Sequence, residues 1–207
     1  MKRITDIVPQ KNDKKRVSIF LDGQFFCGIE KITQMTNNLQ VGDMISEEKL
    51  YALVEESEYT CAFERAVKAL SRSNKTKKQL VTYLKGKSFD NRVIGRVINK
   101  LEEYGYLDDS QFATTFIEIK KRGWGKRRLE AELNFKGVDA KIVEEAVSKI
   151  DDEDENAYLV AKKYCKSRPV DYDLKVKAFR YLVSKGFTYD SVNAALDRLI
   201  RESGGEI

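Results

Sequence analysis

Histidine is absent from this 207-residue chain, and only two prolines and three cysteines occur. Without histidine, the chain lacks the commonest general base and metal ligand, which excludes Ser-His and Cys-His nucleophiles and the usual zinc finger. The phosphate loop GxxxxGK[ST] and the dinucleotide fingerprint GxGxxG are also missing. Little remains from which to build a catalytic site. We therefore expect a protein that is not an enzyme and that holds no cofactor or metal.

The three cysteines lie far apart, at Cys27, Cys61 and Cys165, and form no CxxC pair. Scattered cysteines in odd number are typical of reduced thiols in a cytosolic protein. The sequence has no run of 18 apolar residues, and its first residues lack the apolar core of a signal peptide. The expected location is the cytoplasm, with no attachment to a membrane.

Charge is abundant but unevenly distributed. The formal net charge is +5, and Asp, Glu, Lys and Arg make up 34% of the residues. Residues 64–136 alone hold 18 Lys and Arg against 9 Asp and Glu. A basic zone of this kind favours binding to a polyanion or an acidic protein surface. A solvated helix surface is the alternative explanation.

The first 45 residues are rich in β-forming side chains. Two such runs, 16–21 and 24–29, flank Asp22-Gly23 and predict a hairpin. Residues 4–8 can add a third strand that ends at Pro9. A short helix is expected from Glu30 to Met35, and Ser46 is a candidate N-cap for a following helix.

The rest of the chain repeats with a spacing of 49 residues. Taking Ser88, Gly137 and Gly186 as origins, lysine stands one residue and eleven residues before each of them. Apolar residues stand eight and four before each origin, and again six to thirteen after it, on one face of each helix. Glycine at the origin ends a helix cheaply in the left-handed conformation, whereas Ser88 pays some strain or adopts another turn. Asp90, Asp139 and Asp190 stand near the start of the next helix, where a side-chain oxygen can cap it.

The predicted fold is therefore mainly α, with three tandem three-helix repeats in an elongated array after a small β-rich N-terminal subdomain. The expected boundaries are 1–45 for the β-rich part, 46–57 for a connecting helix, 58–106, 107–150 and 156–201 for the repeats, and 202–207 for a tail. The five consecutive acids 151–155 are interpreted as an exposed acidic linker, about which the third repeat can reorient.

Candidate binding residues are those that the packing of the helices does not require. The lysines near the starts of the middle helices oppose the helix dipole, which favours a phosphate or acidic partner. Trp124, between two glycines, can stack on a base or a partner, or fold back over the core. The predicted basic surface consists of Lys75, Lys77, Lys78, Lys85, Lys87, Arg122, Trp124, Lys126, Arg127, Arg128, Lys136, Lys175 and Lys177. Within it, the second repeat is the densest.

Two segments of the second repeat, 106–113 and 125–138, resemble the central signature of the RecX family of regulatory proteins. The resemblance covers about residues 58–200, although Ser88 departs from it in the first repeat. It implies tandem three-helix repeats that bind the RecA recombinase and its filament on DNA, and that restrain strand exchange and ATP hydrolysis. Some members of the family also contact DNA directly. A monomer is expected. The alternative is a direct DNA-binding protein that uses a three-helix unit like a helix-turn-helix.

Overall fold

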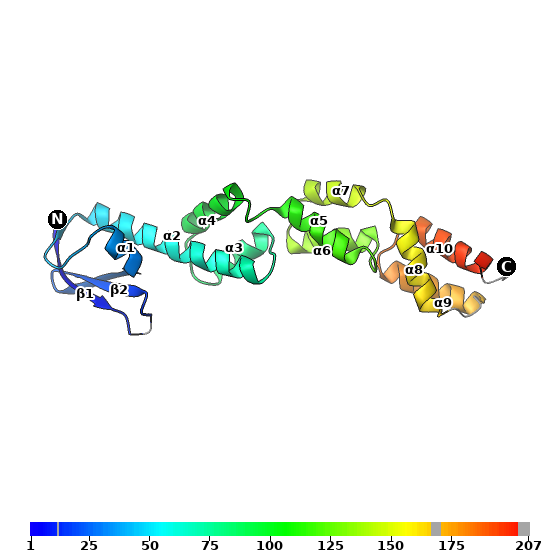
Figure 1. Ribbon diagram of the computed structural model, residues 1–207, viewed down its shortest axis with the longest axis horizontal. Coiled ribbons are helices and arrows are strands. Elements are labelled where there is room, and N and C mark those ends of the chain that lie inside the picture. Colours follow the sequence, from blue (N-terminus) through cyan, green and yellow to red (C-terminus); the bar gives the residue numbers. More distant parts are fainter. Residues whose placement is uncertain (12, 167–170, 203–207) are drawn as a thin grey trace. The chain divides into compact units, whose positions relative to one another are not determined.

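The computed structural model describes residues 1–11, 13–166 and 171–202 (Figure 1). It divides into two compact units. Unit 1 comprises Met1–Lys75 and Leu80–Leu107, and unit 2 comprises Thr76–Gln79 and Asp108–Ile207. The predicted class, a small β-rich part followed by three-helix repeats in tandem, is confirmed.

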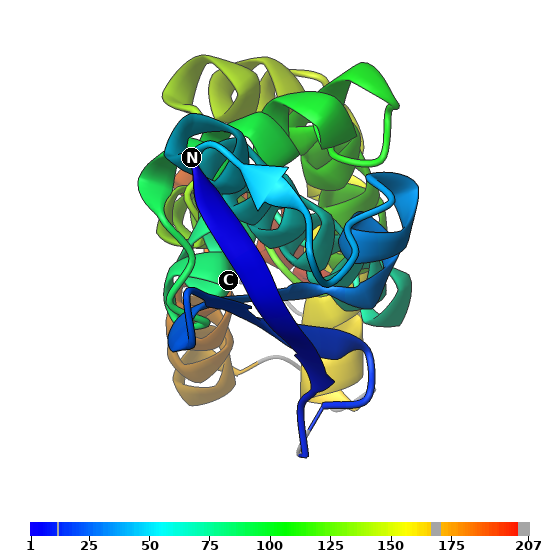
Figure 2. The same ribbon diagram turned by 90° about the vertical axis from the view of Figure 1, so that its left-hand side faces the viewer.

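Unit 1 begins with an antiparallel sheet in the order β3-β2-β1-β4, which Figure 2 shows in blue. Its strands are β1 (Lys2–Pro9), β2 (Arg16–Leu21), β3 (Gln24–Glu30) and β4 (Met44–Ile45). The predicted hairpin joins β2 to β3. Asp22 and Gly23 both have positive φ, at +48° and +82°, which is the geometry that an Asp-Gly hairpin turn requires. The predicted third strand is β1, and the predicted short helix is α1 (Lys31–Thr36).

A long helix, α2 (Glu47–Arg72), covers the sheet with its first turns and continues into the first repeat. Ser46 caps it by accepting a hydrogen bond from the backbone N–H of Lys49 at 3.3 Å. The connecting helix expected at 46–57 and the first helix of the first repeat are thus one helix. No glycine or proline interrupts residues 46–72, so nothing in this stretch ends the helix.

The three repeats have the same order of helices. The first consists of the second half of α2 with α3 (Lys77–Lys85) and α4 (Asn91–Glu103). The second contains α5 (Asp109–Lys120), α6 (Lys126–Lys136) and α7 (Ala140–Ser148), and the third contains α8 (Glu153–Cys165), α9 (Tyr172–Ser184) and α10 (Tyr189–Glu202). Each repeat has its own apolar core. The leucines four residues before the origins are fully buried in all three: Leu84, Leu133 and Leu182.

The turn at each origin has the same geometry. Ser88, Gly137 and Gly186 all take left-handed backbone conformations, with φ of +64°, +81° and +83°. Of the two alternatives for Ser88, the structure therefore shows the left-handed one. Asp90 and Asp139 cap the following helices, as expected. Asp190 instead lies inside the first turn of α10, because that helix begins at Tyr189.

The prediction that residues 151–155 form an exposed linker is wrong for the central residue, Glu153. Glu153 is the first residue of α8 and is only 7% exposed. Its Oε1 accepts a hydrogen bond from the backbone N–H of Lys126 at 2.8 Å, and its Oε2 accepts one from the Thr188 hydroxyl at 3.0 Å. The carboxylate thereby ties the second repeat to the third inside unit 2, which leaves no exposed hinge at this position.

Candidate functional site

The lysines at the helix starts lie in packed contacts of unit 2. The backbone N–H of Lys126 donates to Glu153, and that of Lys77 donates to the Asp109 carboxylate at 2.8 Å. Asp109 and Glu153 are each the first residue of the next repeat's first helix. A carboxylate at a helix N-terminus compensates the unfavourable cation there. The structure therefore supplies an internal acid at the helix starts where the sequence pattern suggested a phosphate or an acidic partner.

The neighbouring cations of α6 also pack within the chain. Arg128 lies against Gly186 and places its guanidinium over the ring of Trp124, 4.2 Å from the centroid. Arg127 lies over the ring of Tyr189 at 4.6 Å. These two arginines thus join the second repeat to the third, and a Cβ atom on Gly186 would collide with Arg128.

Of the two alternatives considered for Trp124, the structure shows the one in which it folds back over the core. It is half-buried and packs against the core of the second repeat, with its ring edge-on to Phe116 at 6.0 Å. It also forms part of the wall of a pocket in unit 2.

This pocket, the repeat 3 pocket, has a volume of about 640 Å³. Cationic and aromatic side chains dominate its wall, which is formed by Arg122, Gly123, Trp124, Val160, Lys163, Tyr164, Lys166, Tyr181 and Lys185. All four charged residues of the wall are cations. Tyr164 and Tyr181 stack on each other with their ring centroids 4.4 Å apart. A concave surface lined by positive charges concentrates anions.

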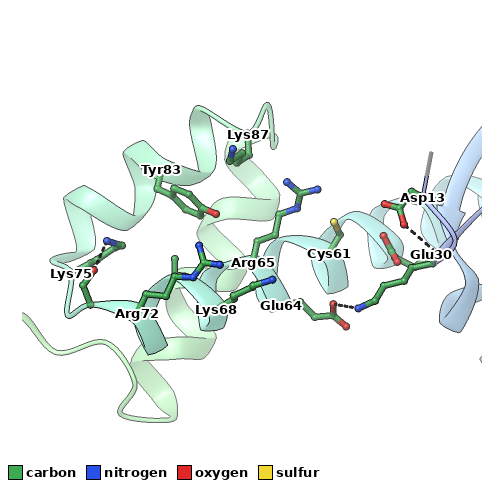
Figure 3. Close-up of a pocket in the computed structure, with 13 residues that line it drawn as sticks. Asp13, Glu30, Cys61, Glu64, Arg65, Lys68, Arg72, Lys75, Tyr83 and Lys87 are labelled. Atoms are coloured by element: carbon green, nitrogen blue, oxygen red, sulfur yellow. Dashed lines mark hydrogen bonds and ion pairs between the residues drawn. The ribbon is translucent and has the colours of Figure 1, made fainter.

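A second basic pocket, the repeat 1 groove, lies in unit 1 and has a volume of about 560 Å³ (Figure 3). Figure 3 shows Arg65, Lys68 and Arg72 along α2, with Tyr83 and Lys87 across from them. The rest of the wall is formed by Asp13, Lys15, Glu30, Cys61, Glu64, Ala69, Ser73 and Lys75.

Each of the three acids of the groove has a partner at the end of the groove that contains Lys15. Glu64 pairs with Lys15 at 3.7 Å, and Glu30 pairs with Arg16 at 3.6 Å. Asp13 accepts a hydrogen bond from the backbone N–H of Lys15 at 3.0 Å. The opposite end of the groove, around Arg72, therefore keeps an excess of positive charge.

The two pockets gather four of the predicted residues: Lys75 and Lys87 in the groove, and Arg122 and Trp124 in the repeat 3 pocket. The other predicted residues lie elsewhere. Lys78 packs on Gly137, Lys136 lies over the ring of Phe116, Lys175 faces Asp197 at 4.0 Å, and Lys85 and Lys177 are exposed.

Sequence reasoning missed the cations in or just after the first helix of the first and third repeats. Arg65, Lys68 and Arg72 are spaced by three and four residues, which places them on one face of α2 and could have been recognised. Lys163 and Lys166 give no comparable signal, because they belong to the site only through their proximity to Tyr181 of α9 and to Lys185 just after it.

Within the described ranges, no three His, Cys, Asp or Glu side chains come together as a metal site, and none of the helices is long and apolar enough to span a membrane. None of the three cysteines, all of which lie in the described ranges, forms a disulfide.

Comparisons with known proteins agree with this architecture segment by segment. Four family models match in order: the regulatory protein RecX N-terminal domain at residues 2–46, and its first, second and third three-helix domains at 62–101, 108–147 and 151–196. A regulatory protein RecX from Clostridium botulinum (strain Alaska E43 / Type E3) is 33% identical over 93% of both chains. The chain belongs to the RecX family.

Other members of the family are similar over most of the chain. A regulatory protein RecX from Clostridium perfringens (strain SM101 / Type A) is 34% identical, covering 96% of this chain and 97% of its own. A crystal structure of regulatory protein RecX superposes with a TM-score of 0.68 at 20% identity, covering 98% of this chain and 100% of the other. The crystal structure of RecX from Lactobacillus salivarius gives 0.64 at 23% identity, covering 69% of this chain and 96% of the other. These two structures share the fold.

Proposed function

We propose that this protein is a non-enzymatic regulator that binds RecA and the RecA filament on DNA. Bound there, it restrains strand exchange and ATP hydrolysis during DNA repair and the SOS response. The observation that carries the proposal is the match to all four RecX domains in their order, with relatives that are named regulatory proteins. The activity places the protein in the cytoplasm, where it acts as a monomer.

The two basic pockets support a binding role. Lys and Arg side chains dominate their charged walls, and such cations bind phosphates and carboxylates. A filament of RecA on DNA presents phosphates and protein surface together, so a regulator of that filament needs surfaces of this kind.

The alternative, a helix-turn-helix-like DNA-binding protein, fits the structure less well. A recognition helix presents free cations and polar groups to the major groove. In or just after the last helix of each repeat, at least one cation is instead paired with an acid: Arg96 with Glu55, Lys149 with Glu145 and Arg198 with Glu155. We therefore expect any contact with DNA to use the pockets.

The test is ATP hydrolysis by RecA on single-stranded DNA, measured while the protein is added up to one copy per RecA. The expected result is a progressive loss of hydrolysis. An unrelated basic protein of similar net charge is the control, because it competes for DNA without binding RecA. Unchanged hydrolysis at equal stoichiometry would contradict the proposed function. Size-exclusion chromatography with light scattering tests the monomer.

A further inference from the structure

A tyrosine–lysine pair recurs in the first and third repeats at equivalent positions. Tyr83 and Tyr181 each stand five residues before the origin, and Lys87 and Lys185 each stand one residue before it. In both repeats the ammonium group lies over the ring, 5.8 Å from the centroid in the first and 5.1 Å in the third. Both pairs line the basic pocket of their repeat.

The opposite wall of each pocket is equivalent as well. Ala66 of α2 and Ala161 of α8 are fully buried in the cores of their repeats, and in each helix another buried alanine precedes them by four residues. Lys68 and Lys163 follow these alanines by two residues and line the two pockets. A tyrosine and two lysines therefore recur in both pockets, from the first helix of the repeat and from the end of the second helix and the turn after it, whereas the rest of each wall differs.

The second repeat lacks this chemistry at the equivalent positions. Glu132 stands where the other repeats have tyrosine. On α5, Ile117 is buried like the alanines, and the residue two positions later is Ile119, which is exposed. An acid and an apolar side chain thus replace the tyrosine and the lysine. The pocket is a property of the first and third repeats, although the second has the densest basic sequence.

Most cations of these pockets have no counterion among the described residues; the exception is Lys15, which pairs with Glu64. Within the part of the chain that the structure describes, Arg65, Lys68, Arg72 and Lys87 of the groove form no ion pair, and neither do the four cations of the repeat 3 pocket. By contrast, nearby Lys121 pairs with Asp152 at 3.1 Å, and Lys162 pairs with Glu202 at 3.7 Å. Mutually repelling cations held in a concavity are stabilised by a bound anion.

We propose that these pockets are two equivalent sites for the phosphate backbone of single-stranded DNA. A nucleic-acid strand presents phosphate groups at regular intervals. A repeating ligand of this kind matches a protein that carries the same tyrosine and lysines in two of its repeats. The tyrosine beside the cations favours nucleic acid over an acidic protein surface, because single strands are bound by cations that track phosphates and by aromatic rings that contact bases. The proposal rests on the proposed function, since it identifies how a filament regulator contacts the DNA of the filament.

The experiment measures binding of a fluorescent thymidine oligonucleotide to the full-length protein by anisotropy, without RecA and over a series of salt concentrations. Two double variants each remove one pocket's lysines: Lys68→Ala with Lys87→Ala, and Lys163→Ala with Lys185→Ala. The matched control, Lys141→Ala with Lys149→Ala in the second repeat, removes the same charge outside the pockets. Circular dichroism verifies that each variant is folded.

Each pocket variant is expected to bind about tenfold more weakly or worse, because charged hydrogen bonds to phosphate are lost. The slope of log affinity against log salt should fall by about one to two, since each lost phosphate contact removes about 0.7 for a single strand. Tyr83→Leu and Tyr181→Leu should weaken binding several-fold and leave that slope unchanged. The control should stay within about twofold of wild type. An equal loss in the control, or full affinity in both pocket variants, would overturn the proposal.

A second readout separates this proposal from the proposed function. Pocket variants that keep full affinity for DNA but no longer inhibit RecA would show that the pockets contact an acidic surface of RecA, which overturns the DNA assignment alone. A wild-type protein that binds DNA through the pockets without inhibiting RecA would instead contradict the proposed function alone.

Discussion

The carboxylate of Glu153 lies between the backbone N–H groups of Lys126 and Thr188, at 2.8 and 3.3 Å from Oε1, and so connects the start of α6 with the turn before α10. Its Oε2 accepts hydrogen bonds from the hydroxyls of Thr188 and Ser191 at 3.0 and 3.3 Å. One buried side chain therefore satisfies donors from the second and third repeats at once.

Glu153→Ala should lower the free energy of unfolding of unit 2 by about 3 kcal/mol, because it strands several buried donors that each cost about 1–3 kcal/mol. Glu153→Gln should cost less, since the amide oxygen still accepts. Urea denaturation followed by circular dichroism measures both. Asp151→Ala is the control, because Asp151 is exposed in the same acidic run. Equal destabilisation by the two alanine variants would contradict the role assigned to Glu153.

The burial of Glu153 within the acidic run could not be predicted from the sequence. Five consecutive acids are normally solvated, and nothing local distinguishes Glu153 from its neighbours. Its burial depends on donors 27 and 35 residues away in the chain. The buried stripes of the repeats, by contrast, follow from local periodicity, and Leu84, Leu133 and Leu182 were predictable without any tertiary contact.

The candidate site likewise contains some residues that the sequence predicts and others that only the tertiary structure reveals. The position of Lys87 at a helix end follows from the 49-residue repeat. The membership of Lys163 in a pocket does not, because α8 and α9 come together only through tertiary packing. Charge density in the sequence favoured the second repeat, yet Arg127 and Arg128 there pack on Tyr189 and Gly186.

Gly125→Ala should destabilise unit 2 by several kcal/mol, because a Cβ atom at Gly125 would overlap the backbone of Phe187 in the third repeat. Gly123→Ala is a matched control two residues away, since a Cβ there meets nothing within 4 Å. Thermal unfolding monitored by circular dichroism should show a large fall in Tm for the first variant and a change of at most a few degrees for the second. Similar Tm values would mean that the two repeats do not pack through Gly125.

Ser88→Gly should stabilise unit 1 by about 0.5–1 kcal/mol. Ser88 holds φ at +64°, which costs an L-residue about 1–2 kcal/mol. Glycine removes this cost, but part of the gain is offset because glycine increases the conformational entropy of the unfolded chain. The change restores the residue found at the other two origins, Gly137 and Gly186. Chemical denaturation of both proteins gives the difference, and a variant less stable than wild type would show that the serine side chain contributes more than its backbone costs.

The thiol of Cys27 should ionise only in strongly alkaline solution. Burial raises its pKa to about 11, against a lowering influence from the Arg16 guanidinium. Because only the thiolate is alkylated, the rate of modification by iodoacetamide should rise about tenfold per pH unit from pH 7 until it levels off near 11. Peptide mapping by mass spectrometry isolates the Cys27 rate from those of Cys61 and Cys165. Arg16→Leu should raise the pKa of Cys27 further and slow the reaction at a given pH. A rate that levels off near pH 9 would show that the thiol is not shielded from water.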